Sequence, residues 1–103
     1  MNGNKLAAAL GLAARAGKIR SGDFITEKLL KGGKAKVIIL DTEASAATEE
    51  RYTRACERMG ARLIRVTGFG RFIGKPGHIA AAVTDRGFEQ MILRAAEEPS
   101  GDN

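Results

Sequence analysis

The stretch that most constrains the fold is KVIILD, Lys36–Asp41, an apolar and β-branched run with no polar residue between its ends. A strand with one face in water alternates apolar and polar residues, and this run does not alternate. A glycine pair lies shortly before it, and the Asp ends it. The run therefore predicts a strand covered on both faces, and hence a sheet with helices on each side.

Two helices are predicted before this strand. Asn4 is the expected N-cap of the first, which Gly17 closes. Ser21 or Asp23 is the expected cap of the second, which ends at the pair 32–33. The expected inward positions are Leu6, Leu10 and Ala13 in the first helix and Ile25, Leu29 and Leu30 in the second.

Two further helices follow the strand. The clearest spans Ser45–Met59, where apolar residues recur at helical spacing and two glutamates near the N-terminus suit the helix dipole. Cys56 lies on its apolar face, which indicates a small core residue. Thr84 or Asp85 is the expected cap of the last helix. The inward positions are Tyr52, Ala55, Cys56 and Met59 in the first of these and Phe88, Ile92 and Ala95 in the second.

Short strands are predicted at 18–20, 62–66 and 79–84, so that strands and helices alternate along the chain. This alternation predicts an α/β fold with a small sheet between helical layers. A chain of 103 residues with 44% hydrophobic content has room for one modest core. We expect a single domain over 1–96 and a disordered acidic tail over 97–103.

The net charge of +5 is distributed in blocks. Residues 1–36 hold eight Lys and Arg against two acids, 37–50 hold four acids and no base, and 51–94 hold nine bases against three acids. Two basic segments separated by an acidic loop suit a face that binds a polyanion, although a solvated surface gives the same count. Nucleic acid is therefore one candidate partner.

The glycine-rich stretch VTGFGRFIGKPGH, 66–78, raises the question of nucleotide binding. A dinucleotide fingerprint needs a full helix after its first glycines, and Pro76 and Gly77 come too soon for one. A phosphate-binding loop of the GxxxxGK[ST] type also fails, since Gly70 to Lys75 is one residue short and Pro76 replaces the hydroxyl that holds magnesium. We expect no nucleotide cofactor. GKPGH is expected to be an exposed basic turn after a short helix at most.

Other functional classes find little support. The chain has one cysteine and one histidine, so we expect neither a structural metal site nor a disulfide framework. No nucleophile–base pair stands out, and we expect a non-enzyme without cofactors. No apolar run reaches the length of a membrane span and no secretory signal is present, which predicts a cytoplasmic protein. Arg51, Arg54 and Arg58 form a stripe that is interpreted as a solvated helix face.

Several motifs in order resemble a known family. They are LGLAARAGKIRSGDFITEKLLKGGKAKVIIL, FGRFIGK before the last strand, and AAAVTDRGF at the last strand–helix junction. Together they resemble the kink-turn-binding ribosomal protein family named after the archaeal large-subunit protein seven-Ae, and within it the bacterial YlxQ-like branch. The likeness covers about residues 5 to 95.

The resemblance implies a three-layer α-β-α sandwich with a mixed four-stranded sheet and no catalytic machinery. It implies structured RNA as the ligand, either a kink-turn or ribosomal RNA, and components of the ribosome or of ribonucleoproteins as further partners. It places RNA at the N-terminus of the second helix and the loop before the last strand, here 18–28 and 74–79. The candidate RNA-binding residues are Lys18, Arg20, Ser21, Gly22, Asp23, Phe24, Lys28, Lys75, Pro76, Gly77 and His78.

One departure from the family motif bears on specificity. Members with the full motif carry an Asn-Glu pair ahead of the Lys matched by Lys28, and this pair contacts the edges of sheared G·A pairs; Phe24 and Ile25 stand there in this chain. Two roles are open for Phe24, stacking on a base or, as favoured, packing under the first helix. Lys75 and His78 are expected to be exposed. A lone histidine in a loop is more often incidental than a group that contacts the ligand. The alternative function is a protein-interaction or assembly module of the same fold.

Overall fold

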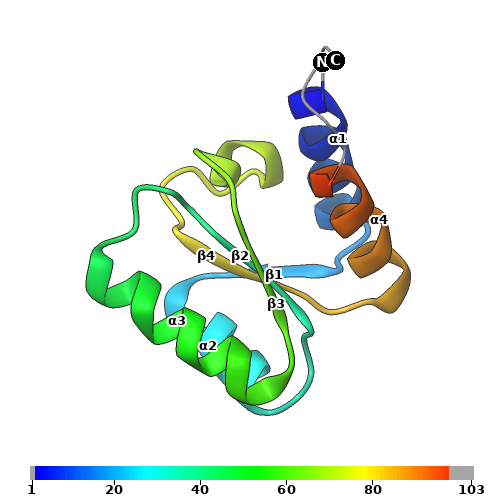
Figure 1. The fold of residues 1–103 in the computed structure, drawn as a ribbon. Coiled ribbons are helices and arrows are strands. Elements are labelled where there is room, and N and C mark those ends of the chain that lie inside the picture. Colours follow the sequence, from blue (N-terminus) through cyan, green and yellow to red (C-terminus); the bar gives the residue numbers. More distant parts are fainter. Residues whose placement is uncertain (1, 98–103) are drawn as a thin grey trace.

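The computed structural model describes residues 2–97, with side chains from Lys5 onward (Figure 1). Four helices, four strands and one 3-10 helix follow one another along the chain. They are α1 (Asn2–Arg15), β1 (Ile19–Ser21), α2 (Asp23–Lys31), β2 (Val37–Leu40), α3 (Ala46–Met59), β3 (Arg62–Arg65), η1 (Phe69–Ile73), β4 (Ala80–Val83) and α4 (Arg86–Glu97). The predicted alternation of strands and helices is confirmed.

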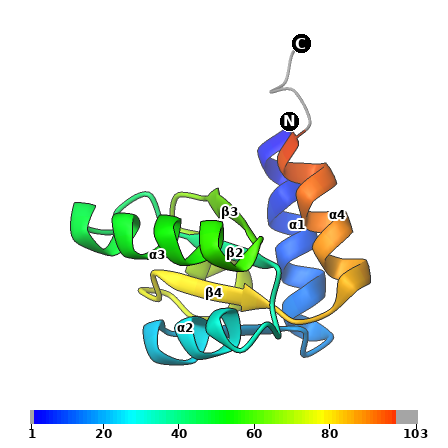
Figure 2. The ribbon, with the colours of Figure 1, turned by 60° about the horizontal axis from the view of Figure 1, so that its bottom comes forward.

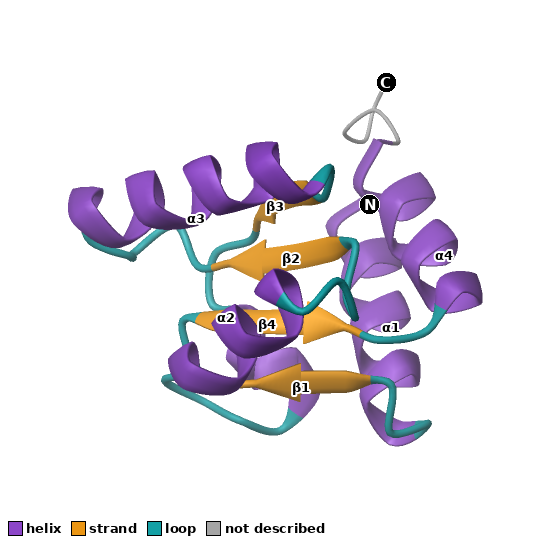
Figure 3. Cartoon of the chain, turned by 90° about the horizontal axis from the view of Figure 1, so that it is seen from below, coloured by secondary structure: helices purple, strands orange, loops and turns teal. Residues whose placement is uncertain are grey.

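The strands form one sheet in the order β1-β4-β2-β3 (Figure 3). β4 is antiparallel to both of its neighbours, β1 and β2, whereas β2 and β3 are parallel. The sheet is therefore mixed, as the resemblance implied. β1 is an edge strand, and its first residue, Ile19, pairs with the last residue of β4, Val83.

All four residues of β2 are buried, as are all four of β4. Because successive side chains in a strand point to opposite faces, Val37 and Ile39 join a core with α1, η1 and α4, whereas Ile38 and Leu40 join a core with α2 and α3. Figures 1 and 2 show α1 and α4 together on one side and α2 and α3 on the other. The three-layer sandwich is confirmed, and the continuous run that predicted it lies at its centre.

α3 and α4 begin where the sequence predicted, and a side chain caps each of them. The Ser45 hydroxyl accepts a hydrogen bond from the Thr48 N–H at the start of α3, and the Asp85 carboxylate accepts one from the Phe88 N–H at the start of α4. The prediction for α1 was wrong, since the helix begins at Asn2, before the expected cap Asn4. Cys56 is buried in the core as predicted, and burial raises its thiol pKa to about 11.

At the C-terminus, α4 continues to Glu97, the first residue of the expected tail. The rest of that tail, 98–103, lies outside the described residues. Within residues 2–97, none of the helices combines the length and apolar character that crossing a membrane requires.

Candidate nucleic-acid interface

Gly22 forms the turn between β1 and α2. Its φ of 117° is one that residues with a side chain rarely adopt. Its N–H donates to the Ala80 carbonyl at 2.9 Å, and its carbonyl accepts from the Thr26 N–H at 3.0 Å. Gly22 is the N-cap, and no side chain caps the helix. The prediction of Ser21 or Asp23 as the cap was therefore wrong, and both side chains are bonded to distant residues instead.

Ser21 joins this turn to the glycine loop. Its hydroxyl oxygen lies 2.7 Å from Nδ1 of His78, 57 positions away in the sequence. His78 is consequently half-buried rather than exposed, and it has a defined structural contact. The structure thus brings together the two segments that the sequence marked separately.

The glycine loop itself is a formed turn. After η1, the Lys75 N–H donates to the Gly70 carbonyl at 2.7 Å, and the His78 N–H donates to the Lys75 carbonyl at 3.1 Å. The buried Asp41 carboxylate holds the start of the loop by accepting from the Gly68 N–H at 3.0 Å. Residues 74–77 are exposed, and they carry Lys75 and Pro76 to the surface. The expected short helix followed by a basic turn is confirmed.

Phe24 projects into solvent from the first turn of α2, with 80% of its surface exposed. The favoured interpretation, that it packs under the first helix, was wrong. The buried face of α2 consists of Thr26 and Leu30, one turn apart. Phe24 is two residues before Thr26, a rotation of about 200° around the helix, so it points away from the core. It lines a hollow of about 300 Å³ together with Glu27, Lys28 and Lys31.

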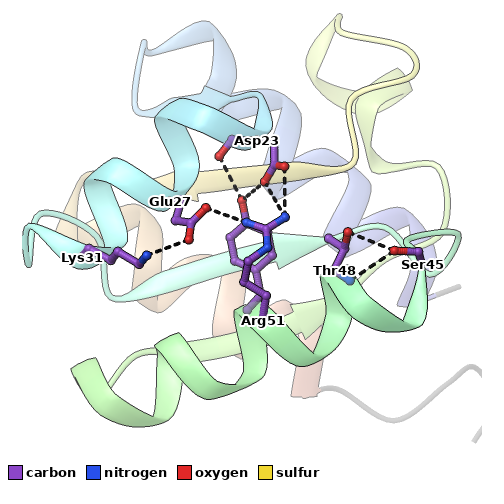
Figure 4. A network of polar contacts seen from close by, with 7 residues as sticks. Asp23, Glu27, Lys31, Ser45, Thr48 and Arg51 are labelled. Carbon is purple, nitrogen blue, oxygen red and sulfur yellow. Dashed lines mark hydrogen bonds and ion pairs between the residues drawn. The ribbon is translucent and has the colours of Figure 1, made fainter.

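Asp23 connects α2 to α3 (Figure 4). Its carboxylate accepts hydrogen bonds from the Tyr52 hydroxyl and from the Arg51 guanidinium, which also pairs with Glu27. The Tyr52 hydrogen bond, with the nearby Arg51, lowers the pKa of Asp23 despite partial burial. Burial, and then the Asp23 carboxylate, raise the pKa of Tyr52 well above its usual range. Asp23 therefore orients α2 rather than offering a free charge to a ligand.

The same contacts revise the interpretation of the arginine stripe on α3. Arg54 and Arg58 are exposed, as a solvated face requires, and Arg54 pairs with Glu50 at 2.6 Å. Arg51 instead bridges to α2. Sequence analysis missed this role because the partners lie 24 and 28 positions away.

We expect Tyr52→Phe to lower the free energy of unfolding by about 1–2 kcal/mol at neutral pH, because a hydrogen bond to a charged group is lost. The lowered pKa of Asp23 means that this stabilisation is present above its ordinary value of 3.8 and disappears as the pH falls through the lowered value. Urea unfolding of both proteins between pH 7 and pH 2 measures the difference. A difference that persists unchanged at the acid end would contradict the assignment to the Asp23 carboxylate.

Arg20 lies within β1, and Lys18 directly precedes the strand. Arg20 is exposed in the middle of β1. It lines a pocket of about 250 Å³ with Ser21 of the same strand, with residues of α1 and η1, and with Lys75 and His78 of the glycine loop. Lys18 lies at the opposite end, where its carbonyl accepts from the Thr84 N–H at 2.9 Å. The structure therefore brings Arg20 and Ser21 together with Lys75 and His78. Phe24 and Lys28 are exposed on α2, which follows directly, and Lys18 lies away from this group.

This small α/β sandwich carries an exposed aromatic ring, exposed lysines and a glycine turn, which are groups that nucleic-acid-binding modules use. Residues 4–92 match the Ribosomal protein L7Ae/L30e/S12e/Gadd45 family. The chain belongs to this family.

The chain also matches individual proteins and solved structures. The chain is 33% identical over 96 residues to the RNA-binding protein YlxQ of Bacillus subtilis (strain 168), covering 90% of this chain and 96% of the relative. A solved structure of a protein of unknown function from Bacillus halodurans C matches with a TM-score of 0.86 and 28% identity, over 91% of this chain and 98% of that one. The 15.5kD RNA binding protein of Giardia lamblia matches with a TM-score of 0.75 over 92% of this chain and 84% of that one; at 19% identity it shows the fold alone.

Proposed function

We propose that this protein is a non-catalytic RNA-binding domain that recognises structured RNA of the kink-turn kind and acts in the cytoplasm at the ribosome or in translation. The observation that carries the proposal is the hydrogen bond between Ser21 and His78, which joins the start of α2 and the glycine loop into one surface. Those are the two segments through which the family resemblance implies RNA contact. Its relative YlxQ is described as RNA-binding, which supports the same ligand class.

The chemistry of this surface suits a folded RNA. The first turn of α2 has no side-chain cap, so its backbone N–H groups are available to a phosphate. Lys28 on α2 and Lys75 in the glycine loop are exposed, and they supply positive charge where RNA strands crowd together. Phe24 offers a flat apolar ring on which an unpaired base can stack. In this proposal, phosphate contacts give most of the affinity, and stacking replaces the edge contacts of the Asn-Glu pair.

Competition binding tests the proposal. A labelled RNA with a kink of tandem sheared G·A pairs is bound at low salt and competed with the same RNA unlabelled or with a plain duplex of equal length. We expect the kinked RNA to compete better, by a smaller factor than for a family member that carries the Asn-Glu pair. Equal competition by the two RNAs would contradict recognition of the kink.

We expect Phe24→Ala to weaken binding of the kinked RNA by about 1–3 kcal/mol, the usual cost of losing one base–aromatic stack. Phe24→Tyr is the matched control, because it keeps the ring and should keep the affinity. Thermal unfolding of the Ala variant should match the parent protein, since the ring is 80% exposed. Parental affinity of the Ala variant would remove Phe24 from the interface.

A second candidate function, a protein-interaction module, is favoured by a different surface. A hollow of about 480 Å³ between α1 and α4 has an apolar lining that includes Leu12 and Met91, which are 46% and 41% exposed. Ionic strength separates the two functions: RNA binding through phosphates weakens steeply as salt rises, whereas an apolar protein interface does not.

A further inference from the structure

A second basic surface lies at the opposite end of the sheet from Phe24 and the glycine loop. There β2 and β3 begin, β4 ends and α4 begins. These ends surround a hollow of about 540 Å³ that we call the far pocket. Its lining contains four cationic residues and a single carboxylate: Lys34, Lys36, Arg62 and Arg86, with Glu89.

The carboxylates near the far pocket are already bonded. Asp85 accepts the Phe88 N–H at 3.0 Å, and Glu89 accepts the Lys36 N–H at 3.1 Å. Glu97 lies 3.3 Å from Arg62 in an exposed pair. By contrast, Lys34 and Arg86 make no ion pair or side-chain hydrogen bond within residues 2–97. Four cations therefore face three nearby carboxylates, Asp85, Glu89 and Glu97, which leaves a small excess of positive charge and two cations without an ion pair or side-chain hydrogen bond among the described residues.

Arg86 does not serve the stability of its own helix. It is the first residue of α4, where the positive end of the helix dipole disfavours a cation. An exposed arginine held at such a position, beside an unpaired lysine, suits an anionic ligand better than it suits the free protein.

We call the start of α2, with Phe24 and Lys28, together with the glycine loop that carries Lys75, the first surface. An exposed basic path connects the far pocket to it. This path follows β1, which lies at the edge of the sheet (Figure 3). Arg20 is exposed in the middle of this strand. The exposed Lys18 directly precedes the strand, and its carbonyl accepts a hydrogen bond from the N–H of Thr84 of the far pocket. Lys18 has no carboxylate partner among the described residues. Lys18 therefore lies on this path, away from the other predicted RNA contacts.

We propose that the far pocket is a second RNA-binding surface, which holds the phosphodiester backbone of an RNA arm that leaves the first surface and follows β1. This inference rests on the proposed function. None of the exposed large apolar side chains of residues 5–97, which are Leu12, Phe24, Phe72 and Met91, lines the far pocket. It therefore lacks a ring for base stacking, and its contacts are with phosphates, independent of sequence.

The test uses the full chain and two RNAs: a short one with the kink alone, and a long one in which one arm is extended by a full helical turn. Lys34→Gln with Arg86→Gln changes the far pocket, and Lys28→Gln with Lys75→Gln changes the first surface. We expect the far-pocket variant to bind the long RNA about 10-fold more weakly and the short RNA within about 2-fold of the parent protein. The first-surface variant should lose affinity for both RNAs.

Salt dependence gives an independent readout. For the parent protein, the slope of log affinity against log salt should be steeper for the long RNA by roughly one to two, and the far-pocket variant should lose this difference. Equal slopes, or an equal loss of affinity for both RNAs, would overturn the proposal of a second surface.

If the first-surface variant binds the short RNA as well as the parent protein does, the proposed function fails instead. If the far-pocket variant keeps its RNA affinities but no longer sediments with nuclease-treated ribosomal particles, the surface serves a protein partner, and this inference is wrong.

Discussion

Reversing two charges, with Lys28→Glu and Lys75→Glu in one protein, is expected to lower affinity for the kinked RNA by roughly 100-fold or more. Each lysine is exposed, and they lie on two segments that the contact between Ser21 and His78 joins. A charge-assisted contact to phosphate contributes about 1–3 kcal/mol, and a carboxylate in its place adds repulsion. Two such changes together exceed about 3 kcal/mol, which is a factor of roughly 150. Fluorescence anisotropy with the short RNA at low salt measures the loss.

A control with the same change in net charge separates local contacts from the overall field. Arg58→Glu with Arg94→Glu places two reversals at exposed positions on α3 and α4. This control should lose far less affinity than the double lysine variant, and both should unfold as the parent protein does. A loss of the same size in the control would mean that RNA responds to total charge rather than to a defined surface.

Much of the fold could be predicted from the sequence, because the responsible signals are local. The unbroken run of β2 indicated a strand buried on both faces, and it lies at the centre of the sandwich. The spacing of Tyr52, Ala55 and Cys56 placed these three side chains on the buried face of α3. The start of α3 at Ser45 could also be predicted, because the Thr48 N–H that the Ser45 hydroxyl accepts from is only three residues away.

The start of α2 could not be predicted in the same way, because its determinants are distant in sequence. Ser21 and Asp23 are both good caps by residue type. Ser21 instead contacts His78, and Asp23 contacts Tyr52, 29 positions away. With these side chains engaged, the chain turns at Gly22.

Phe24 illustrates a second limit of sequence analysis. An aromatic residue in a helix is usually assumed to face the core. In α2 the buried positions are occupied by Thr26 and Leu30, so the ring is outside. Only the helix phase, which is set by packing against the sheet, distinguishes a core residue from one available to a ligand.

Gly70→Ala is expected to destabilise the protein by about 3 kcal/mol and to weaken RNA binding as well. A Cβ atom at Gly70 would lie 2.3 Å from the Lys75 carbonyl oxygen, and that neighbour is backbone rather than a flexible side chain. Relief of this contact requires the turn to open, which breaks the 2.7 Å hydrogen bond from the Lys75 N–H to the Gly70 carbonyl. This bond shapes the turn that carries Lys75 and Pro76. Its loss should therefore displace the basic surface, which weakens RNA binding as well as lowering stability.

Gly74→Ala is the matched control, since it adds the same methyl group four residues later. Gly74 has a φ of 76° with nothing within 4 Å of an added Cβ, so its cost is backbone strain alone, about 1–2 kcal/mol. Urea unfolding should therefore rank Gly70→Ala as the more destabilised variant. RNA titration at a temperature where both are folded should show the larger loss for Gly70→Ala. If the two variants behave alike, the close approach of the backbone at Gly70 does not shape the turn.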